Sequence, residues 1–355
     1  MTTLKLDELQ VLLADAQPIR DVVLAEADLS GVDLSGGLFE RVDFRACRLR
    51  GANLSGNIFV ACQFDGVDAV ESNWHRSALS DCSLKGTHLR RARWSEARGH
   101  ANDFEGADFG SADLGDGAWA KCRFTQARLD RAQLVRFAMV ECDTVGIDLS
   151  GVQCQQVILM GADLRQAKLL GASFEAVVLN QAQLEGADLR GLNFARAQFM
   201  EAKLAGADLR GACLVQAGFK SADLRGAKLD GCDARNAVWV EACLDDASLV
   251  GTHLYQSLWV DTQAARVQLQ NAQMGQAICH RAHLPGAQFE GADLTYTDFS
   301  HADLTQARFG RNTWLRTKFH RTKRDGVSIH PGSDVLWDDP ELAAAEQRVP
   351  QPLAS

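Results

Sequence analysis

A large apolar residue recurs at every fifth position of this chain, and this register constrains the fold more than any other feature. Of the 60 positions from Leu24 to Phe319 that share it, 53 are Leu, Phe, Trp or Met. Two positions before each of these residues, 54 of 60 residues are Ala, Cys, Ser, Thr, Val or Gly. No insertion or deletion interrupts the five-residue register. A period of five fits neither a helix nor a simple strand. It predicts a chain that turns a corner every five residues, with one large and one small side chain pointing inward on each side.

The stretches AEADLSGVDLSG, LEGADLRG and LAGADLRGACL resemble the pentapeptide repeat family, whose consensus is A-(D/N)-L-x-x. The resemblance implies an all-β solenoid, a right-handed quadrilateral parallel β-helix with four pentads per coil. Sixty pentads then make about 15 coils, which at the spacing of paired strands is a rod roughly 70 Å long. The Asp and Asn residues that precede the large residue match the consensus, and we interpret them as structural.

Seven positions of the large register hold a small residue, and six of the seven lie one pentad from a Trp or Met. Gly99, for example, follows Trp94. A close-packed interior keeps its total volume, so we expect the oversized neighbour to fill the space beside each small residue.

The ends of the chain depart from the repeat. Residues 4–16 place Leu4, Leu9, Leu12 and Leu13 near helical spacing before Pro18, which predicts a short helix that caps the first coil. Three segments follow from this: an N-terminal helical cap over 1–21, the β-helix over 22–323, and a C-terminal cap over 324–355. In the last segment, residues 338–341 predict the start of a brief helix that runs to residue 348. Residues 349–355 are expected to be disordered.

Charge and composition exclude several classes of protein. A net charge of -9 argues against binding nucleic acid through bulk positive charge, and no apolar run reaches the ~18–20 residues that span a bilayer. The first residues, MTTLKLDELQ, lack the basic-then-apolar layout of a signal peptide. Ten cysteines without an export signal fit reduced thiols in a bacterial cytoplasm. We therefore expect a cytoplasmic protein with no membrane insertion and no nucleic-acid partner.

No motif for catalysis or metal binding is evident. Most cysteines occupy the inward positions of the repeat, and Cys62/Cys82 and Cys122/Cys142 lie one coil apart, so we interpret them as core filler. None forms the closely spaced ligand pair that is typical of structural zinc sites. His280 and His283 could cluster with His301 on adjacent coils, but no nucleophile accompanies them. We predict no catalytic residue, no metal site, no cofactor and no enzymatic activity.

One of the four faces is apolar where the others are acidic. At the outward position before the large residue, three faces hold six, six and seven Asp or Asn residues, whereas the fourth holds Asp298 alone. A long apolar stripe exceeds what a soluble monomer normally exposes. It predicts a face that contacts another protein, although terminal segments that fold over it are an open alternative. Its residues are Leu38, Ile58, Val60, Ile158, Met160, Val178, Met200, Val238, Val240, Leu258, Val260 and Ile278.

The C-terminal end of the repeat is basic. Two interpretations remain open: a solvated rim that prevents rods from stacking, or a site for an anionic partner. The residues of this rim are Arg311, Arg316, Lys318, Arg321, Lys323 and Arg324.

We expect a non-enzymatic scaffold for protein–protein interaction. A long repeat with a short leading helix resembles accessory proteins of type VI secretion, which implies an adaptor or chaperone for a bacterial effector or secretion assembly. Two alternatives stay open, a homodimeric structural rod and a DNA mimic that binds DNA gyrase or topoisomerase. Duplex DNA carries one charge per about 1.7 Å, so a rod of roughly 70 Å would need roughly 40 negative charges. The net charge of -9 makes that mimicry weak.

Overall fold

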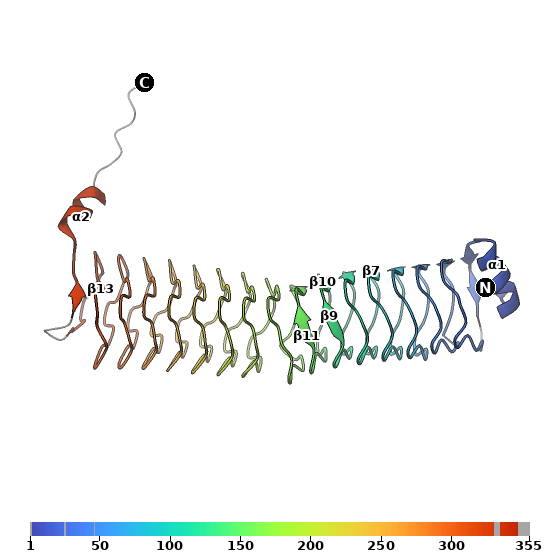
Figure 1. The fold of residues 1–355 in the computed structure, drawn as a ribbon, viewed down its shortest axis with the longest axis horizontal. Coiled ribbons are helices and arrows are strands. Elements are labelled where there is room, and N and C mark those ends of the chain that lie inside the picture. Colours follow the sequence, from blue (N-terminus) through green and yellow to red (C-terminus); the bar gives the residue numbers. More distant parts are fainter. Residues whose placement is uncertain (1, 25, 46, 330–333, 347–355) are drawn as a thin grey trace, which may run out of the picture. The chain divides into compact units, whose positions relative to one another are not determined.

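The computed structural model of the chain describes residues 2–24, 26–45, 47–329 and 334–346. The chain divides into two compact units, Met1–Ala187 with Leu192–Phe199 and Asp188–Gly191 with Met200–Ser355. The predicted β-helix segment, residues 22–323, therefore contributes to both. In each unit, successive coils stack on one another (Figure 1).

The first unit is a parallel solenoid whose pairing register is 20 residues. Leu38 pairs with Ile58, Ile58 with Ala78 and Ala78 with Arg98, which confirms four pentads per coil. One face forms an eight-stranded sheet in the order β12-β10-β8-β7-β6-β5-β4-β2. Its strands are β2 (Ile19–Arg20), β4 (Leu38–Glu40), β5 (Ile58–Val60), β6 (Ala78–Ser80), β7 (Arg98–His100), β8 (Ala118–Ala120), β10 (Ala138–Val140) and β12 (Ile158–Met160). β9 (Gln133–Val135) pairs with β11 (Gln153–Gln155) on another side.

The second unit keeps the same 20-residue register through isolated parallel bridges. Gly218 pairs with Val238, Val238 with Leu258, and Leu258 with Ile278. Its named elements are β13 (Thr317–Lys318), β14 (Val335–Leu336) and α2 (Pro340–Glu346). The all-β parallel solenoid predicted from the repeat is thus present in both units.

Each pentad folds because its inward side chains are apolar and its backbone is satisfied by the neighbouring coils. The Leu29 amide donates to the Arg48 carbonyl at 2.9 Å, and the Arg48 amide donates to the Ala27 carbonyl at 3.0 Å. The corner falls two residues after the large side chain, in the left-handed region, with φ of 67° at Gly31 and 52° at Arg41. Only Gly adopts this conformation without steric cost, which explains the frequent Gly at this point of the repeat.

The core consists of stacked columns of large residues. Leu164 and Leu184 are buried in the first unit, as are Leu204 and Leu224 in the second. Aromatic rings stack from coil to coil. Trp74 lies 4.5 Å from Trp94 between ring centroids and at 6° between ring planes.

The small inward column holds a polar ladder. The Asn102 side chain accepts from the Cys82 amide at 2.9 Å through Oδ1 and donates to the Leu79 carbonyl at 3.0 Å through Nδ2. Since both ends of its amide are paired, Asn102 is structural.

The N-terminal cap combines a helix and a strand. α1 (Leu6–Ala14) is shorter than the predicted 4–16 and buries Leu9. Its Leu13 lies so close to Gly37 that a Cβ built there would be 2.5 Å from Leu13 Cδ2. β1 (Thr2–Thr3) pairs with β3 (Val22–Val23), a strand that the sequence did not predict. Ile19 is buried in β2, so the solenoid begins at least one pentad before the predicted boundary at residue 22.

The C-terminal cap differs from the prediction in one element. β14 pairs with β13 in parallel and covers the edge of the last coil, a strand that the sequence did not predict. The expected helix is present as α2, and Asp339 Oδ1 accepts from the amides of Glu341 and Leu342 at 2.9 and 3.1 Å. The predicted disordered tail, 349–355, lies outside the described residues. Among those that are described, no helix is long and apolar enough to cross a membrane.

Candidate functional site

The apolar face predicted from the sequence is the outer surface of the strands in the eight-stranded sheet and of the equivalent bridges. In the first unit, pairing joins Leu38, Ile58, Ala78, Arg98, Ala118, Ala138, Ile158, Val178 and Gln198 into one row. Ile58 is 50% exposed and Met160 37%, whereas Leu38, Val60, Ile158 and Val178 are half-buried. Arg98 and His100 are exposed in β7 and interrupt the row, so the apolar surface of this unit consists of two patches.

In the second unit the row runs through Gly218, Val238, Leu258, Ile278, Asp298 and Lys318. Ile278 and Met200 are about equally exposed, at 41% and 42%. Val238, Val240, Leu258 and Val260 are half-buried. The row turns polar at Asp298, where the Lys318 ammonium lies 3.3 Å from the carboxylate. This unit therefore carries one apolar patch with a charged C-terminal border.

The basic rim is largely neutralised by acidic partners. Lys318 pairs with Asp298 and Lys323 with Asp303, both at 3.3 Å. Arg321 Nη1 lies 3.0 Å from Glu346, and Arg324 stacks on the Trp337 ring at 4.7 Å. Arg311 and Arg316 are exposed and have no carboxylate within 4 Å in the part of the chain that the structure describes. The rim is thus a weaker anion site than its sequence suggested.

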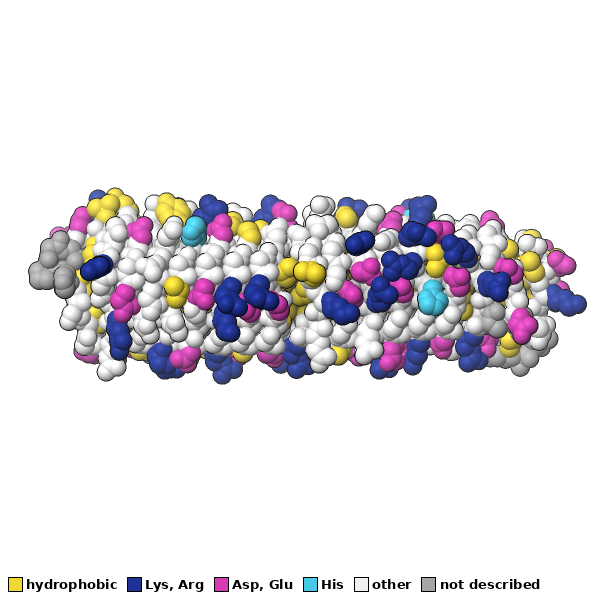
Figure 2. All heavy atoms as spheres, turned by 90° about the horizontal axis from the view of Figure 1, so that it is seen from below, with side chains coloured by type: hydrophobic (Ala, Val, Ile, Leu, Met, Phe, Trp, Pro, Cys, Tyr) yellow, Lys and Arg dark blue, Asp and Glu magenta, His cyan; other side chains and the backbone are white. Residues whose placement is uncertain are grey.

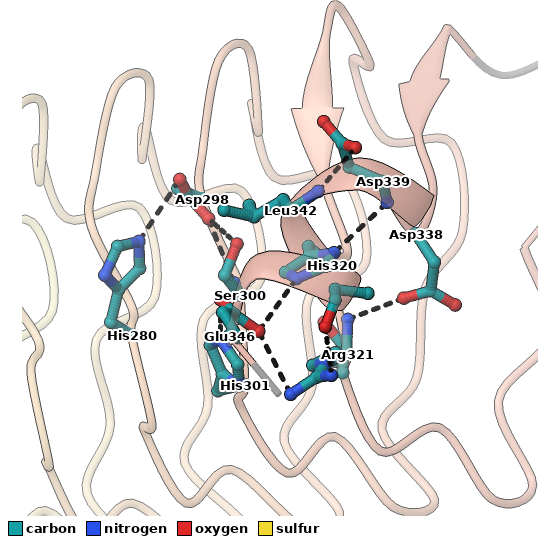
Figure 3. Close-up of polar contacts among 12 residues, drawn as sticks. His280, Asp298, Ser300, His301, His320, Arg321, Asp338, Asp339, Leu342 and Glu346 are labelled. Carbon is teal, nitrogen blue, oxygen red and sulfur yellow. Dashed lines mark hydrogen bonds and ion pairs between the residues drawn. The ribbon is translucent and has the colours of Figure 1, made fainter. Parts of the chain in front are cut away.

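A second cluster forms where α2 meets the last coils (Figure 3). The Glu346 carboxylate, at the end of α2, lies 3.2 Å from His301 Nε2, 3.4 Å from His320 Nε2 and 3.0 Å from Arg321 Nη1. His320 is buried, with 4% of its surface exposed. We call the three donors His301, His320 and Arg321 the carboxylate cradle.

The hydrogen bonds of His320 decide what the cradle can bind. Its Nδ1 faces the Asp339 backbone amide at 3.1 Å, and an amide can only donate. In the neutral ring, Nδ1 is therefore the acceptor and Nε2 carries the proton, which it donates to Glu346. Two imidazoles and a carboxylate within 4.8 Å of one another have the composition of a metal site, but this tautomer and the adjacent Arg321 favour an anion.

The charge on Glu346 is stabilised in this position. Partial burial raises the pKa of its carboxyl, but hydrogen bonds from His320 and His301 and the charge on Arg321 outweigh that effect, so the net pKa lies below its ordinary value. The arrangement binds a carboxylate in its ionised form.

Sequence analysis missed this cluster. His301 and His320 lie on adjacent coils, which the register could have shown, but Glu346 lies beyond the repeat and no register places it. The suggested grouping of His280, His283 and His301 does not form. His283 instead lies 3.5 Å from Asp303, and His280 lies 3.2 Å from Asp298.

The ten cysteines are free thiols. Eight are buried, whereas Cys213 and Cys243 are half-buried. Burial raises the pKa of Cys47 to about 11 and that of Cys232 to about 12. A thiol with a raised pKa is a poor nucleophile and a poor metal ligand at neutral pH, consistent with a filler role.

Charged side chains elsewhere on the surface pair with one another. On the side drawn in Figure 2, Lys and Arg lie beside Asp and Glu. Arg190, Arg210 and Arg225 each contact the Asp two residues earlier at 2.6 Å. Pairs also join coils, as between Arg41 and Asp21 at 2.6 Å. These pairs cancel much of the negative potential of the acidic faces.

Comparisons with known proteins agree with the repeat. A family model described as Pentapeptide repeats matches in eight copies and covers more than half of the chain, over residues 23–59, 38–73, 77–116, 147–182, 178–216, 217–256 and 279–311. No curated protein matches the sequence.

Several solved structures are similar to this chain. HetL, a pentapeptide repeat protein involved in heterocyst differentiation regulation from the cyanobacterium Nostoc sp. strain PCC 7120, is 25% identical and matches over 73% of this chain and 94% of that chain, with a TM-score of 0.24. Full-length QnrB1, a plasmid-mediated fluoroquinolone resistance protein, is 18% identical over 77% of this chain and 100% of that chain, with a TM-score of 0.19. The A-module of the mannuronan C-5 epimerase AlgE4 from Azotobacter vinelandii is 9% identical over 93% and 94%, with a TM-score of 0.24.

Proposed function

The chain belongs to the pentapeptide repeat family, and we propose that it is a non-enzymatic scaffold that binds another protein through its apolar face. A fold of this kind hosts many functions, so the proposal rests on the surface. Its main support is the asymmetry between faces at one repeat position, where Asp298 is the single Asp or Asn on a face that exposes Ile58 and Ile278.

The fold itself does not require apolar residues at this position. On the other faces, the Asp before the large residue accepts a hydrogen bond from the backbone two residues later, as Asp33 does from the Ser35 amide at 3.0 Å and Asp148 from the Ser150 amide at 3.0 Å. A Val or Ile at the equivalent position forgoes that bond and exposes apolar surface. The apolar residues therefore reduce local stability without benefit to the coil, which supports a role in contact.

Burial of such a patch against a partner is favourable. Apolar surface removed from water contributes about 25 cal/mol per Å², although part of that gain is lost to the costs of association. Arg98 divides the face of the first unit, so we expect contact at separate patches rather than along a continuous stripe.

The test is the double variant Val238→Asp with Leu258→Asp. The two residues pair in adjacent coils, and each would place an unpaired charge in a desolvated contact. Wild type and variant are used as bait in extracts of the native bacterium, and self-association is followed by light scattering. We expect the variant to keep its melting temperature and to lose the complex.

The matched control is Gln268→Asp with Gln288→Asp, which adds the same two charges one coil apart on another face of the same unit. The control should bind as wild type does. If the protein with Val238→Asp and Leu258→Asp binds its partner as wild type does, the apolar face is not the binding surface.

The finer proposal is that the partner is an effector or spike protein of a bacterial secretion assembly, of type VI, and that this protein acts in the cytoplasm as its adaptor or chaperone. The support is the resemblance of a long repeat with a leading helix to such accessory proteins. Identification of the captured protein by mass spectrometry tests it. A second copy of the chain as the captured protein would support the homodimeric rod instead.

Mimicry of DNA toward gyrase or topoisomerase is disfavoured by the ion pairs. A phosphate-like surface needs unpaired negative charge, whereas Asp188, Asp208 and Asp223 are each held by an Arg on the same face or its neighbour. We expect no inhibition of supercoiling by gyrase at micromolar concentrations of the protein. Clear inhibition would contradict the scaffold proposal and support DNA mimicry.

A further inference from the structure

The carboxylate cradle holds one anion with donors from two coils. His301, His320 and Arg321 each lie within 3.4 Å of the Glu346 carboxylate, and their side chains converge on it (Figure 3). Guanidinium and imidazole groups that converge in this way form charge-assisted hydrogen bonds, which are about twice as strong as neutral ones. The cradle is built for a carboxylate, and α2 supplies it from the same chain.

The hold of α2 on the coils is otherwise slight. The helix has seven residues and none of them is buried, and Leu342 remains 46% exposed. Helices this short are not stable by themselves in water, so α2 depends on its docking contacts. Besides Glu346, Arg321 donates to the Ala343 carbonyl at 3.0 Å and to Asp338 through its backbone amide at 2.6 Å.

A cavity of about 420 Å³ remains beside the cradle. Its lining includes the apolar residues Leu336, Trp337 and Leu342 and polar residues such as Lys318 and His320. Leu342 and Glu346 are four residues apart, so they lie on one side of the helix. From α2, the lining of this cavity includes Leu342 and Glu346 and none of the alanines, so a helix with larger apolar side chains on that side would fill more of the cavity.

We propose that the last coils of the second unit bind an acidic helical peptide of a partner protein, and that α2 occupies this site in cis as a weak substitute. If Glu346 leaves, the buried His320 Nε2–H and the Arg321 guanidinium lose their acceptor, and an unpaired buried donor is costly. The vacated cradle therefore favours another carboxylate. The neighbouring charges agree: Lys318 and His280 face Asp298 and Arg281 faces Asp261, so these cations offer no alternative partner to Glu346.

The peptide should carry a Leu-x-x-x-Glu pattern. The Glu occupies the cradle, and the Leu one turn earlier faces Leu336 and Trp337. A simple anion such as inorganic phosphate would satisfy the cradle but would leave the apolar lining residues Leu336, Trp337 and Leu342 exposed to water. Asp298 and Lys318 line this cavity and also end the apolar row, so the second binding site borders the apolar face, but the proposal does not rest on contact at that face.

The experiment measures binding of a fluorescein-labelled peptide with the sequence DDPELAAAE, residues 338–346, to the full chain by anisotropy in EDTA. The variant Glu346→Gln removes the resident carboxylate and should bind the peptide at least tenfold more tightly than wild type. The control variant Glu341→Gln removes a carboxylate from the first turn of the same helix and should bind as wild type does. Replacing the last Glu of the peptide by Gln should abolish the gain, as should Arg321→Gln in the Glu346→Gln background.

Four results would overturn the proposal. The first is Glu346→Gln protein that shows the wild-type melting temperature and no gain in peptide binding. The second is equal binding of the Glu and Gln peptides. The third is binding that appears only when zinc replaces EDTA, which would make the cluster a metal site. The fourth is a wild-type dimer that the Glu346→Gln variant does not form, which would make a second copy, rather than a partner protein, the occupant.

Discussion

The indole of Trp119 fills the space above Gly99 that a side chain there would take. A Cβ built on Gly99 would lie 2.1 Å from Trp119 Cε3, although the two residues are 20 apart in sequence. The sequence assigned this compensation to Trp94, the neighbour one pentad away. In the structure Trp94 packs beside Trp119, with ring centroids 5.6 Å apart, and volume is balanced between coils as well as along one coil.

Gly99→Leu should therefore destabilise the first unit. The added side chain has no space below the indole, and overpacking of this kind costs about 1–3 kcal/mol or more. Trp119→Leu should also destabilise, because it leaves a cavity. The double variant should lose less stability than the sum of the two, by at least about 1 kcal/mol. Thermal unfolding of all four proteins gives this coupling, and strict additivity would contradict the assignment.

Leu204→Asp should unfold the coils around it. Leu204 is fully buried, and its amide donates to the Asp223 carbonyl at 2.6 Å, so an uncompensated charge would lie between packed coils at a cost of several kcal/mol, on the order of 5. The control Leu204→Met keeps the volume and should lose less than about 1.5 kcal/mol. A soluble aspartate variant with an unchanged melting temperature would reject the buried column.

The thiols should react slowly in the native protein. Burial raises the pKa of Cys47 to about 11 and that of Cys154 to about 12, so these two groups carry little thiolate at pH 8, and burial keeps reagents away from the other inward cysteines. With Ellman's reagent, we expect only the half-buried Cys213 and Cys243 to react within minutes, and all ten cysteines to react in denaturant. Metal analysis of the purified protein should find no stoichiometric zinc. Rapid reaction of more than two thiols would argue against the filler role.

Docking of α2 should weaken in acid. The pKa of Glu346 is lowered in the docked state, so docking is stabilised above the ordinary carboxyl value of 4.5 and loses that contribution as the pH falls through the lowered value. Trp337, next to Arg324 at 4.7 Å, reports the transition by fluorescence. The difference between wild type and Trp337→Phe isolates its signal. Glu346→Gln should remove the pH dependence, and an identical titration of that variant would show that another group is responsible.

Much of the fold could be predicted because each pentad repeats the same local requirement. The large register identified the buried columns, as with Leu164 and Leu204, and a register of 20 placed Ile58 beside Leu38 and Leu258 beside Val238. The apolar face followed from the same count, and both its role as a contact surface and its partner stay predictions.

The parts outside the repeat needed the tertiary structure. β1 and β14 are two-residue strands, and their pairing depends on exposed coil edges rather than on a pattern in their own residues. From the sequence, Lys318 and Arg321 belonged to a basic rim. In the structure, Asp298 and Glu346 neutralise them. The cradle depends on α2, and the periodicity of the repeat does not predict where α2 docks on the last coils.

The sequence by itself therefore determined the solenoid, its 20-residue register, its buried columns and the one face with a single Asp or Asn before the large residue, because in a strict repeat each position has the same neighbours from coil to coil. Only the tertiary structure decided how the ends are covered, which charges remain unpaired and that Glu346 meets His320. These features arise from contacts between segments with no common register, such as the final coils and α2, and such contacts are set by packing and hydrogen bonding in three dimensions.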